Sequence, residues 1–175
     1  EKLLKGLDTT KSCGPDDLSA RLLQCLSSEL SPALELLFYT TLQQGQLPRD
    51  WRHARVSPIF KKGNKNNAEN YRPVSLTSII CKIAEHIIVS QMYDHLDLHH
   101  ALTDAQHGFR KRRSTETQLL LTTNDFMSGL EKNVQTDAIL LDFSKAFDKV
   151  PHHLLIHKLK HYGIDRSALG WITAF

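Results

Sequence analysis

Apolar residues recur every three or four positions through most of the chain, and this spacing predicts an amphipathic helix in each such stretch. The stretches cover residues 18–26, 32–44, 79–96, 115–130 and 152–161. Ser31, Ser78 and Ser114 each precede one of them. A serine hydroxyl there can accept a backbone hydrogen bond that the first helical turn leaves unmade, so we expect these residues to be N-caps.

Two shorter segments have the character of β-strands. Trp51–Phe60 alternates in part between apolar and polar residues, and Tyr71–Leu76 resumes this character after the polar loop 61–67. Together they predict an antiparallel hairpin, and Pro73 favours an edge or a bend because proline lacks a backbone donor. A third segment, Ala138–Leu141, is continuously apolar, which is typical of a strand buried on both faces. Several helices with few strands predict an α+β fold.

Asp142 directly follows the third apolar segment. A carboxylate at the end of a buried strand costs free energy unless a cation or a hydrogen-bond donor pairs with it. An acid held rigidly in this way is well placed to bind a metal ion. An ordinary turn residue or helix cap explains the position equally well, and the residues of this segment leave both interpretations open.

The net charge of +3 conceals two concentrated basic segments. Residues 49–72 contain seven basic and two acidic side chains, and residues 110–113 are all basic. The rest of the chain must then carry −6 to leave a total of +3. Such a concentration indicates a localised site for a polyanion. Two solvated loops would give the same pattern, and for any single lysine run they are the commoner explanation.

The composition, with 41% hydrophobic residues, is that of a globular protein. No apolar run is long enough to cross a membrane.

The three cysteines, Cys13, Cys25 and Cys81, are odd in number and far apart in the sequence. We therefore expect reduced, mostly buried thiols in an intracellular protein. The chain starts inside an expected helix and ends in an apolar stretch, which favours a fragment of a longer protein.

The ten histidines invite a metal-site interpretation. His153, His157 and His161 are spaced four residues apart and could share a helix face. No cysteine or acidic residue is placed to complete a zinc site, so a surface cluster is the expected arrangement.

Six short motifs follow one another along nearly the whole chain. They are S-C-G-P-D at 12–16, L-P-R-D-W-R at 47–52, P-I-F-K-K-G at 58–63, N-Y-R-P-V-S-L at 70–76, H-G-F-R at 107–110 with S-T at 114–115, and L-D-F-S-K-A-F-D-K-V-P at 141–151. In this order and approximate spacing, they resemble the reverse transcriptase domain of non-LTR (LINE-type) retrotransposons.

The resemblance implies a right-hand polymerase fold. Residues 1–48 would form a helical N-terminal extension, residues 49–135 the fingers with their β-hairpin, and residues 136–175 the first part of the palm with one isolated strand. The family's second metal-binding motif, an aromatic residue followed by Ala or Val and two aspartates, does not occur in this sequence. The resemblance therefore implies an incomplete active site.

The resemblance also assigns residues to the chemistry. Asp142 would bind the catalytic Mg²⁺, of which the complete enzyme holds two ions, and the backbone carbonyl of Phe143 would help to hold one of them. Lys61 and Arg72 would bind the triphosphate of the incoming nucleotide. Lys62 is a competitor of Lys61, but neighbouring strand residues point to opposite faces, so only one of the two should serve.

Further assignments concern the nucleotide sugar and the nucleic acid. Phe147 matches the family's aromatic residue beneath the sugar, which excludes a 2′-hydroxyl. The segment that resembles the template–primer contact contains Gly108, Phe109, Arg110, Arg112 and Arg113. Phe109 could stack on a base or anchor the loop in the core, and both possibilities stay open.

The expected function is an RNA-directed DNA polymerase that extends a DNA primer on an RNA template by two-metal nucleotidyl transfer, with this chain inactive alone. Its partners would be the RNA template, the DNA primer, deoxynucleoside triphosphates and the remainder of the polymerase polypeptide, with no membrane. The expected location is intracellular, in the nucleus or cytoplasm, and the protein is not secreted. A non-catalytic nucleic-acid-binding remnant of a retroelement is the alternative. The concentrated charge disfavours a helical interaction domain without a nucleic-acid role.

Overall fold

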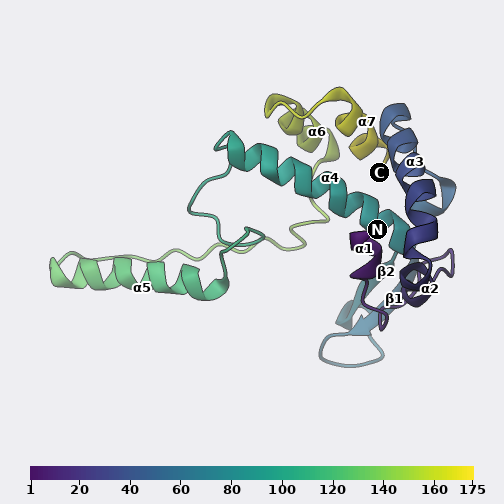
Figure 1. Cartoon of the computed structure of the whole chain (residues 1–175). Helices are drawn as coiled ribbons and strands as arrows, with labels where there is room; N and C mark the ends of the chain where they lie inside the picture. Colours follow the sequence, from purple (N-terminus) through teal and green to yellow (C-terminus); the bar gives the residue numbers. More distant parts are fainter. The chain divides into compact units, whose positions relative to one another are not determined.

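The computed structural model describes residues 1–175 and contains helices and one β-hairpin (Figure 1). In chain order the elements are α1 (Lys2–Lys5), α2 (Ala20–Cys25), α3 (Ser27–Gln44), the 3-10 helix η1 (Arg49–Arg52), β1 (Arg55–Phe60), the 3-10 helix η2 (Ala68–Asn70), β2 (Tyr71–Leu76), α4 (Ile79–Leu98), α5 (Thr115–Glu131), α6 (His152–His161) and α7 (Arg166–Ala174). The chain divides into two units. Unit 1 comprises Glu1–Asp94 and His153–Phe175, and unit 2 comprises His95–His152.

The core of unit 1 lies around the first turns of α4. Ile79 and Ile83 join one buried cluster with Leu23 of α2. Cys81 and Ala84 join a second cluster whose other buried members are Leu47, Trp51 and Trp171. Each large apolar side chain that is fully buried contributes about 1.5–3 kcal/mol, so these two clusters fix the start of α4 firmly.

The start of α4 in turn fixes the end of the hairpin. Ser78, which is fully buried, accepts a hydrogen bond from the backbone N–H of Cys81 at 3.4 Å, as expected for an N-cap. Only Thr77 and Ser78 separate β2 from α4. The predicted cap is therefore confirmed, and β2 leaves directly from the core of unit 1.

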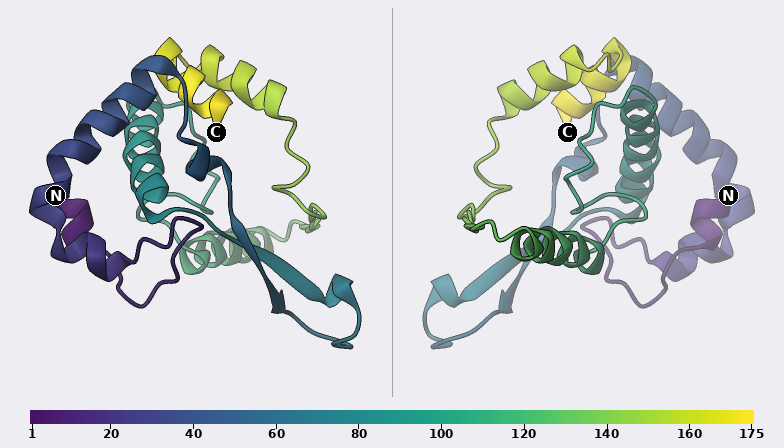
Figure 2. Two further views of the ribbon diagram at one scale, coloured as in Figure 1. Left: turned by 90° about the vertical axis from the view of Figure 1, so that its right-hand side faces the viewer. Right: turned by 90° about the vertical axis from the view of Figure 1, so that its left-hand side faces the viewer.

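The hairpin itself is an antiparallel pair whose register runs from Arg55 opposite Leu76 to Phe60 opposite Tyr71. It projects from the helices of unit 1 with the loop between its strands at the tip (Figure 2). The rings of Phe60 and Tyr71 meet edge to face with centroids 5.5 Å apart. An isolated two-stranded hairpin is marginally stable in water, so its base needs support from the rest of the unit.

The segment around Gly14 provides that support. A Cβ atom on Gly14 would lie 2.6 Å from the backbone N of Ser78 and from the backbone C and O of Thr77. Asp17 accepts a hydrogen bond from the guanidinium of Arg55 at 3.0 Å. The S-C-G-P-D segment and Asp17 thus contact the β2–α4 junction and the first residue of β1, where the hairpin joins the unit.

Unit 2 is built around α5, which is capped as predicted. The Ser114 hydroxyl accepts from the Thr117 backbone N–H, and the Thr117 hydroxyl accepts from the Ser114 backbone N–H, forming a capping box. The periodicity of this stretch predicts that Leu119, Leu120, Phe126 and Leu130 face inward. All four are exposed, and no residue of α5 is buried. This prediction was wrong because periodicity identifies an apolar face without supplying an element to cover it.

The buried strand predicted at Ala138–Phe143 is not formed in this chain. The segment has no regular structure, and its side chains are exposed, with Leu140 at 94%. A strand requires a neighbouring strand to satisfy its backbone hydrogen bonds, and the only sheet in the structure is the β1–β2 hairpin. The continuous apolar run therefore predicted a strand for which residues 1–175 hold no partner.

A second difference concerns α3. The predicted cap at Ser31 was wrong, because the helix begins at Ser27 and Pro32 lies inside it. The Ser31 hydroxyl instead donates to the Ser27 carbonyl at 2.6 Å. Leu34, one turn after Ser31, is buried in the core, so packing keeps the helix continuous despite the backbone donor missing at Pro32. None of the helices is both long and apolar enough to cross a lipid bilayer.

Candidate functional site

Two cations lie on one face of the hairpin in unit 1. The backbone N–H of Lys61 donates to the Asn70 carbonyl at 2.8 Å, which extends the strand register by one pair beyond Phe60 and Tyr71. Since opposite residues share a face and side chains alternate, Lys61 lies on the same face as Asn70 and therefore as Arg72. Both cations are exposed, and neither forms an ion pair.

Lys62 lies in the bend that follows, beyond the paired register, whereas the other face of the hairpin carries the Phe60–Tyr71 ring pair. Arg55 shares the face of Lys61 and Arg72, but Asp17 already neutralises it. The hairpin therefore presents Lys61 and Arg72 together as unpaired cations. Sequence alone identified both residues, whereas their common face follows from the register.

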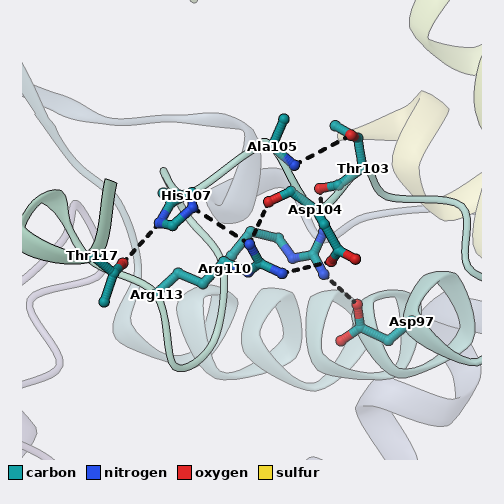
Figure 3. A network of polar contacts seen from close by, with 8 residues as sticks. All are labelled: Asp97, Thr103, Asp104, Ala105, His107, Arg110, Arg113 and Thr117. Atoms are coloured by element: carbon teal, nitrogen blue, oxygen red, sulfur yellow. Dashed lines mark hydrogen bonds and ion pairs between the residues drawn. The ribbon is translucent and has the colours of Figure 1, made fainter. Parts of the chain in front are cut away.

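A polar network in unit 2 uses two of the four consecutive basic residues internally (Figure 3). Arg110, with its side chain 13% exposed, pairs with Asp97 at 3.3 Å and donates to the Thr103 carbonyl at 3.3 Å. Arg113 pairs with the Asp104 carboxylate at 2.5 Å and also donates to the Asp104 carbonyl. These two arginines hold the loop that precedes α5. Their ion pairs with Asp97 and Asp104 neutralise the charge that an external anion would need.

His107 links this network to α5. It is buried, with 7% of its surface exposed, and its Nδ1 lies 2.7 Å from the Thr117 hydroxyl oxygen. That hydroxyl also lies within hydrogen-bond distance of the Ser114 carbonyl, and the arrangement fits the tautomer in which Nδ1 donates to it. Nε2 is then the acceptor that faces Arg113 at 3.5 Å. Sequence reasoning assigned His107 no role, since its partners at 113 and 117 are not marked by any pattern.

Arg112 differs from its two paired neighbours. It is exposed, forms no ion pair, and has a left-handed backbone with φ of +61°. Among the arginines predicted to contact nucleic acid, Arg110, Arg112 and Arg113, it is the one with its guanidinium available. The basic run therefore combines two loop-holding arginines with one outward cation.

Two exposed aromatic rings meet in unit 2. Phe109 and Phe147 lie edge to face, with centroids 5.8 Å apart and ring planes at 89°. Phe109 is 78% exposed, which excludes the core-anchor alternative for this residue. A hollow of ≈ 340 Å³ adjoins Phe109 and Gly108 at the start of α5. The structure thus brings together two residues that the sequence analysis assigned to different contacts, one to template–primer and one to sugar.

Asp142 lies in the irregular segment of unit 2 and is exposed. Its carboxylate and the carbonyl of Phe143 are oxygen donors of the kind that Mg²⁺ prefers, so they fit this ion as part of a ligand set. No three histidine, cysteine, aspartate or glutamate side chains in residues 1–175 are grouped closely enough to hold a metal ion. His153, His157 and His161 are therefore not part of such a group.

Of the three cysteines, all of them free thiols, only Cys81 is buried. Burial raises the pKa of the Cys81 thiol to about 12, and the negative charge of Glu85 acts in the same direction. The thiol donates a hydrogen bond to the Glu85 carboxylate at 3.5 Å, and burial raises the pKa of Glu85 as well. Cys81 is therefore an unreactive core residue. The expectation of mostly buried thiols fails at Cys25, which is exposed.

Residues 59–175 match the family described as "Reverse transcriptase (RNA-dependent DNA polymerase)". The chain belongs to the reverse transcriptase family. The matched region includes Lys61, Arg72, the loop around Phe109 and the Asp142 segment. The family predicted from the six sequence motifs is thereby confirmed.

Curated relatives of this reverse transcriptase chain come from mobile elements. It is 31% identical to the probable RNA-directed DNA polymerase from transposon BS of Drosophila melanogaster over 95% of its length. It is 30% identical to the RNA-directed DNA polymerase from mobile element jockey of the same species over 91%. It is 29% identical to the Pol polyprotein from the type-1 retrotransposable element R2 of Popillia japonica over 75%. The chain spans only 18–19% of the length of these relatives.

Proposed function

We propose that this chain provides the nucleotide-binding and template-binding surfaces of an RNA-directed DNA polymerase. Residues 1–48 would be a helical extension, residues 49–135 the fingers and residues 136–175 the first part of the palm of a right-hand polymerase. The observation that carries the proposal is the pair of unneutralised cations, Lys61 and Arg72, on one face of the projecting hairpin.

The hairpin face has the right chemistry for a triphosphate. Lys61 and Arg72 are diagonal neighbours across the strands, and such positions lie about 7–8 Å apart. Both long side chains can therefore reach one polyphosphate chain. Lysine offers a compact charge, and arginine offers a planar fork that can bind two phosphate oxygens at once. A deoxynucleoside triphosphate is the ligand that we propose for this face.

Asp142 and the carbonyl of Phe143 would hold Mg²⁺ in the complete polymerase. When bound, the ions would supply charge neutralisation at the phosphoryl group during an in-line displacement. Further carboxylates would complete the ligand set, because the family's second metal-binding motif does not occur in this sequence. We propose that the isolated chain binds RNA template and DNA primer without extending the primer.

Replacing Arg72 with alanine in the complete polymerase should raise the KM for deoxynucleoside triphosphates by about 10–100-fold. Loss of charged hydrogen bonds to phosphate, each contributing about 1.5–3 kcal/mol, accounts for this range. Steady-state primer extension on an RNA template would measure it. Lys62→Ala is the matched control, because Lys62 is an exposed lysine of the same hairpin that the proposal does not assign to the triphosphate. The KM of this variant should stay near the wild-type value. Equal effects of the two variants would contradict the assignment.

Replacing Arg112 with alanine in the chain itself should weaken binding to an RNA–DNA duplex and lower the salt dependence. Each phosphate contact that is lost reduces the slope of log K against log salt by about 1. Fluorescence anisotropy across a salt series would give the slope. Arg110→Ala should instead destabilise the loop, because it leaves Asp97 without its partner. An unchanged slope for Arg112→Ala would remove this residue from the contact.

A further inference from the structure

Phe109 and Phe147 form an aromatic pair on the surface of unit 2. Their rings meet edge to face, a favourable arrangement because the positive edge of one ring faces the negative face of the other. Both residues are about three-quarters exposed, at 78% and 76%. A large apolar side chain with so much exposed surface contributes little to the core, so this pair adds little to the stability of the unit.

The backbone holds Phe109 in a conformation that bulky residues rarely adopt. Its φ is +60°, in the left-handed region, whereas the adjacent Gly108, which could take such a value without strain, does not. Two nearby residues are fixed, His107 by Thr117 and the adjacent Arg110 by Asp97. A rare conformation between these two anchored residues persists because its surroundings impose it, and it sets the direction in which the Phe109 side chain leaves the backbone.

Phe147 lies in a run of turns at 144–149, outside any helix or strand. Within such a segment a phenylalanine ring can exchange between staggered rotamers unless a neighbour restricts it. The ring of Phe109 is such a neighbour, and it approaches from the loop that the polar network holds.

We propose that Phe109 is a positioning residue for Phe147 and thereby helps to determine which nucleotide sugar the polymerase accepts. The inference rests on the proposed function, in which the Phe147 ring lies beneath the sugar of the incoming nucleotide. The distance of closest approach to a 2′-oxygen depends on where that ring stands. A ring fixed by Phe109 excludes the hydroxyl, whereas a ring free to rotate admits it more often.

The test compares kcat/KM for deoxynucleoside and ribonucleoside triphosphates in the complete polymerase. Phe109→Leu removes the ring but keeps apolar bulk, and it should lower the preference for the deoxynucleotide by about two- to tenfold, the range expected for loss of an aromatic pair. Phe109→Tyr retains the ring and should restore the wild-type ratio. Phe126→Leu in α5, the matched control, should leave the ratio unchanged.

The double variant separates this inference from the proposed function. If Phe109 acts through Phe147, Phe109→Leu combined with Phe147→Ala should show the same ratio as Phe147→Ala alone. Additive losses would overturn the inference, as would a Phe109→Leu variant that changes only the KM for template–primer. If Phe147→Ala leaves the ratio unchanged, both the sugar contact of Phe147 and the role of Phe109 are overturned. If only Phe109→Leu leaves it unchanged, the proposed function stands and the inference fails.

Discussion

Replacing Asp142 with asparagine in the complete polymerase should lower primer extension by about 10³-fold or more. Asparagine has nearly the same shape, but it lacks the negative charge that a Mg²⁺ ligand contributes, and the loss of one such electrostatic group typically costs a factor of this size. Binding of template and primer should change by no more than about twofold, because that contact is made by basic residues. Primer extension on an RNA template and anisotropy on the same duplex would measure the two quantities.

Asp137 and Asp148 provide the controls for this variant. Both are exposed carboxylates near Asp142 in sequence, and neither is assigned to the metal. Asp137→Asn and Asp148→Asn should therefore retain most of the extension activity. Normal extension by Asp142→Asn would remove Asp142 from the mechanism. A wild-type polymerase that binds the duplex tightly but extends no primer would instead favour the non-catalytic remnant of a retroelement.

Replacing Gly14 with alanine should lower the free energy of unfolding of unit 1 by about 1–3 kcal/mol, the usual cost of forcing an extra methyl group into a packed site. The new Cβ would lie 2.6 Å from backbone atoms of Thr77 and Ser78, which are held by the start of α4 and cannot move aside as a flexible side chain could. Urea denaturation of the chain, followed by tryptophan fluorescence, would report on unit 1, since Trp51 and Trp171 both lie in its core.

Gly6→Ala is the matched control for this experiment. The nearest atom to a Cβ on Gly6 is the Lys2 carbonyl oxygen at 3.5 Å, an ordinary contact. Its unfolding free energy should stay within about 0.5 kcal/mol of the wild-type value, as for most surface substitutions. If Gly14→Ala is as stable as Gly6→Ala, the S-C-G-P-D segment does not pack closely against the β2–α4 junction.

Local signals in the sequence predicted much of the secondary structure. The caps at Ser78 and Ser114 and the strand at Tyr71–Leu76 were correct, because each depends on residues close together in the chain. The predicted cap at Ser31 was wrong because core packing extends the helix beyond this residue toward the N-terminus. The Ser31 hydroxyl therefore donates to a carbonyl one turn earlier in the same helix. The strand at Ala138–Phe143 was wrong in this chain for a non-local reason, the lack of a neighbouring strand.

The candidate site was predictable to a similar extent. The expected alternation along a strand favoured only one of Lys61 and Lys62 and stays a prediction, whereas the register places Arg72 on the face of Lys61. The basic run looked uniform in sequence, whereas the structure pairs Arg110 and Arg113 with acidic residues and leaves Arg112 outward. Which charges in a cluster are neutralised depends on contacts that composition does not encode.

The exposed segment Ala138–Phe143 has one further consequence. It combines aliphatic and aromatic residues without proline, the composition that favours intermolecular cross-β pairing when such a stretch is accessible. Asp142 is the only charge in this segment. The carboxylate that we propose for metal binding would therefore also oppose self-association, because stacked copies of the segment would bring like charges together.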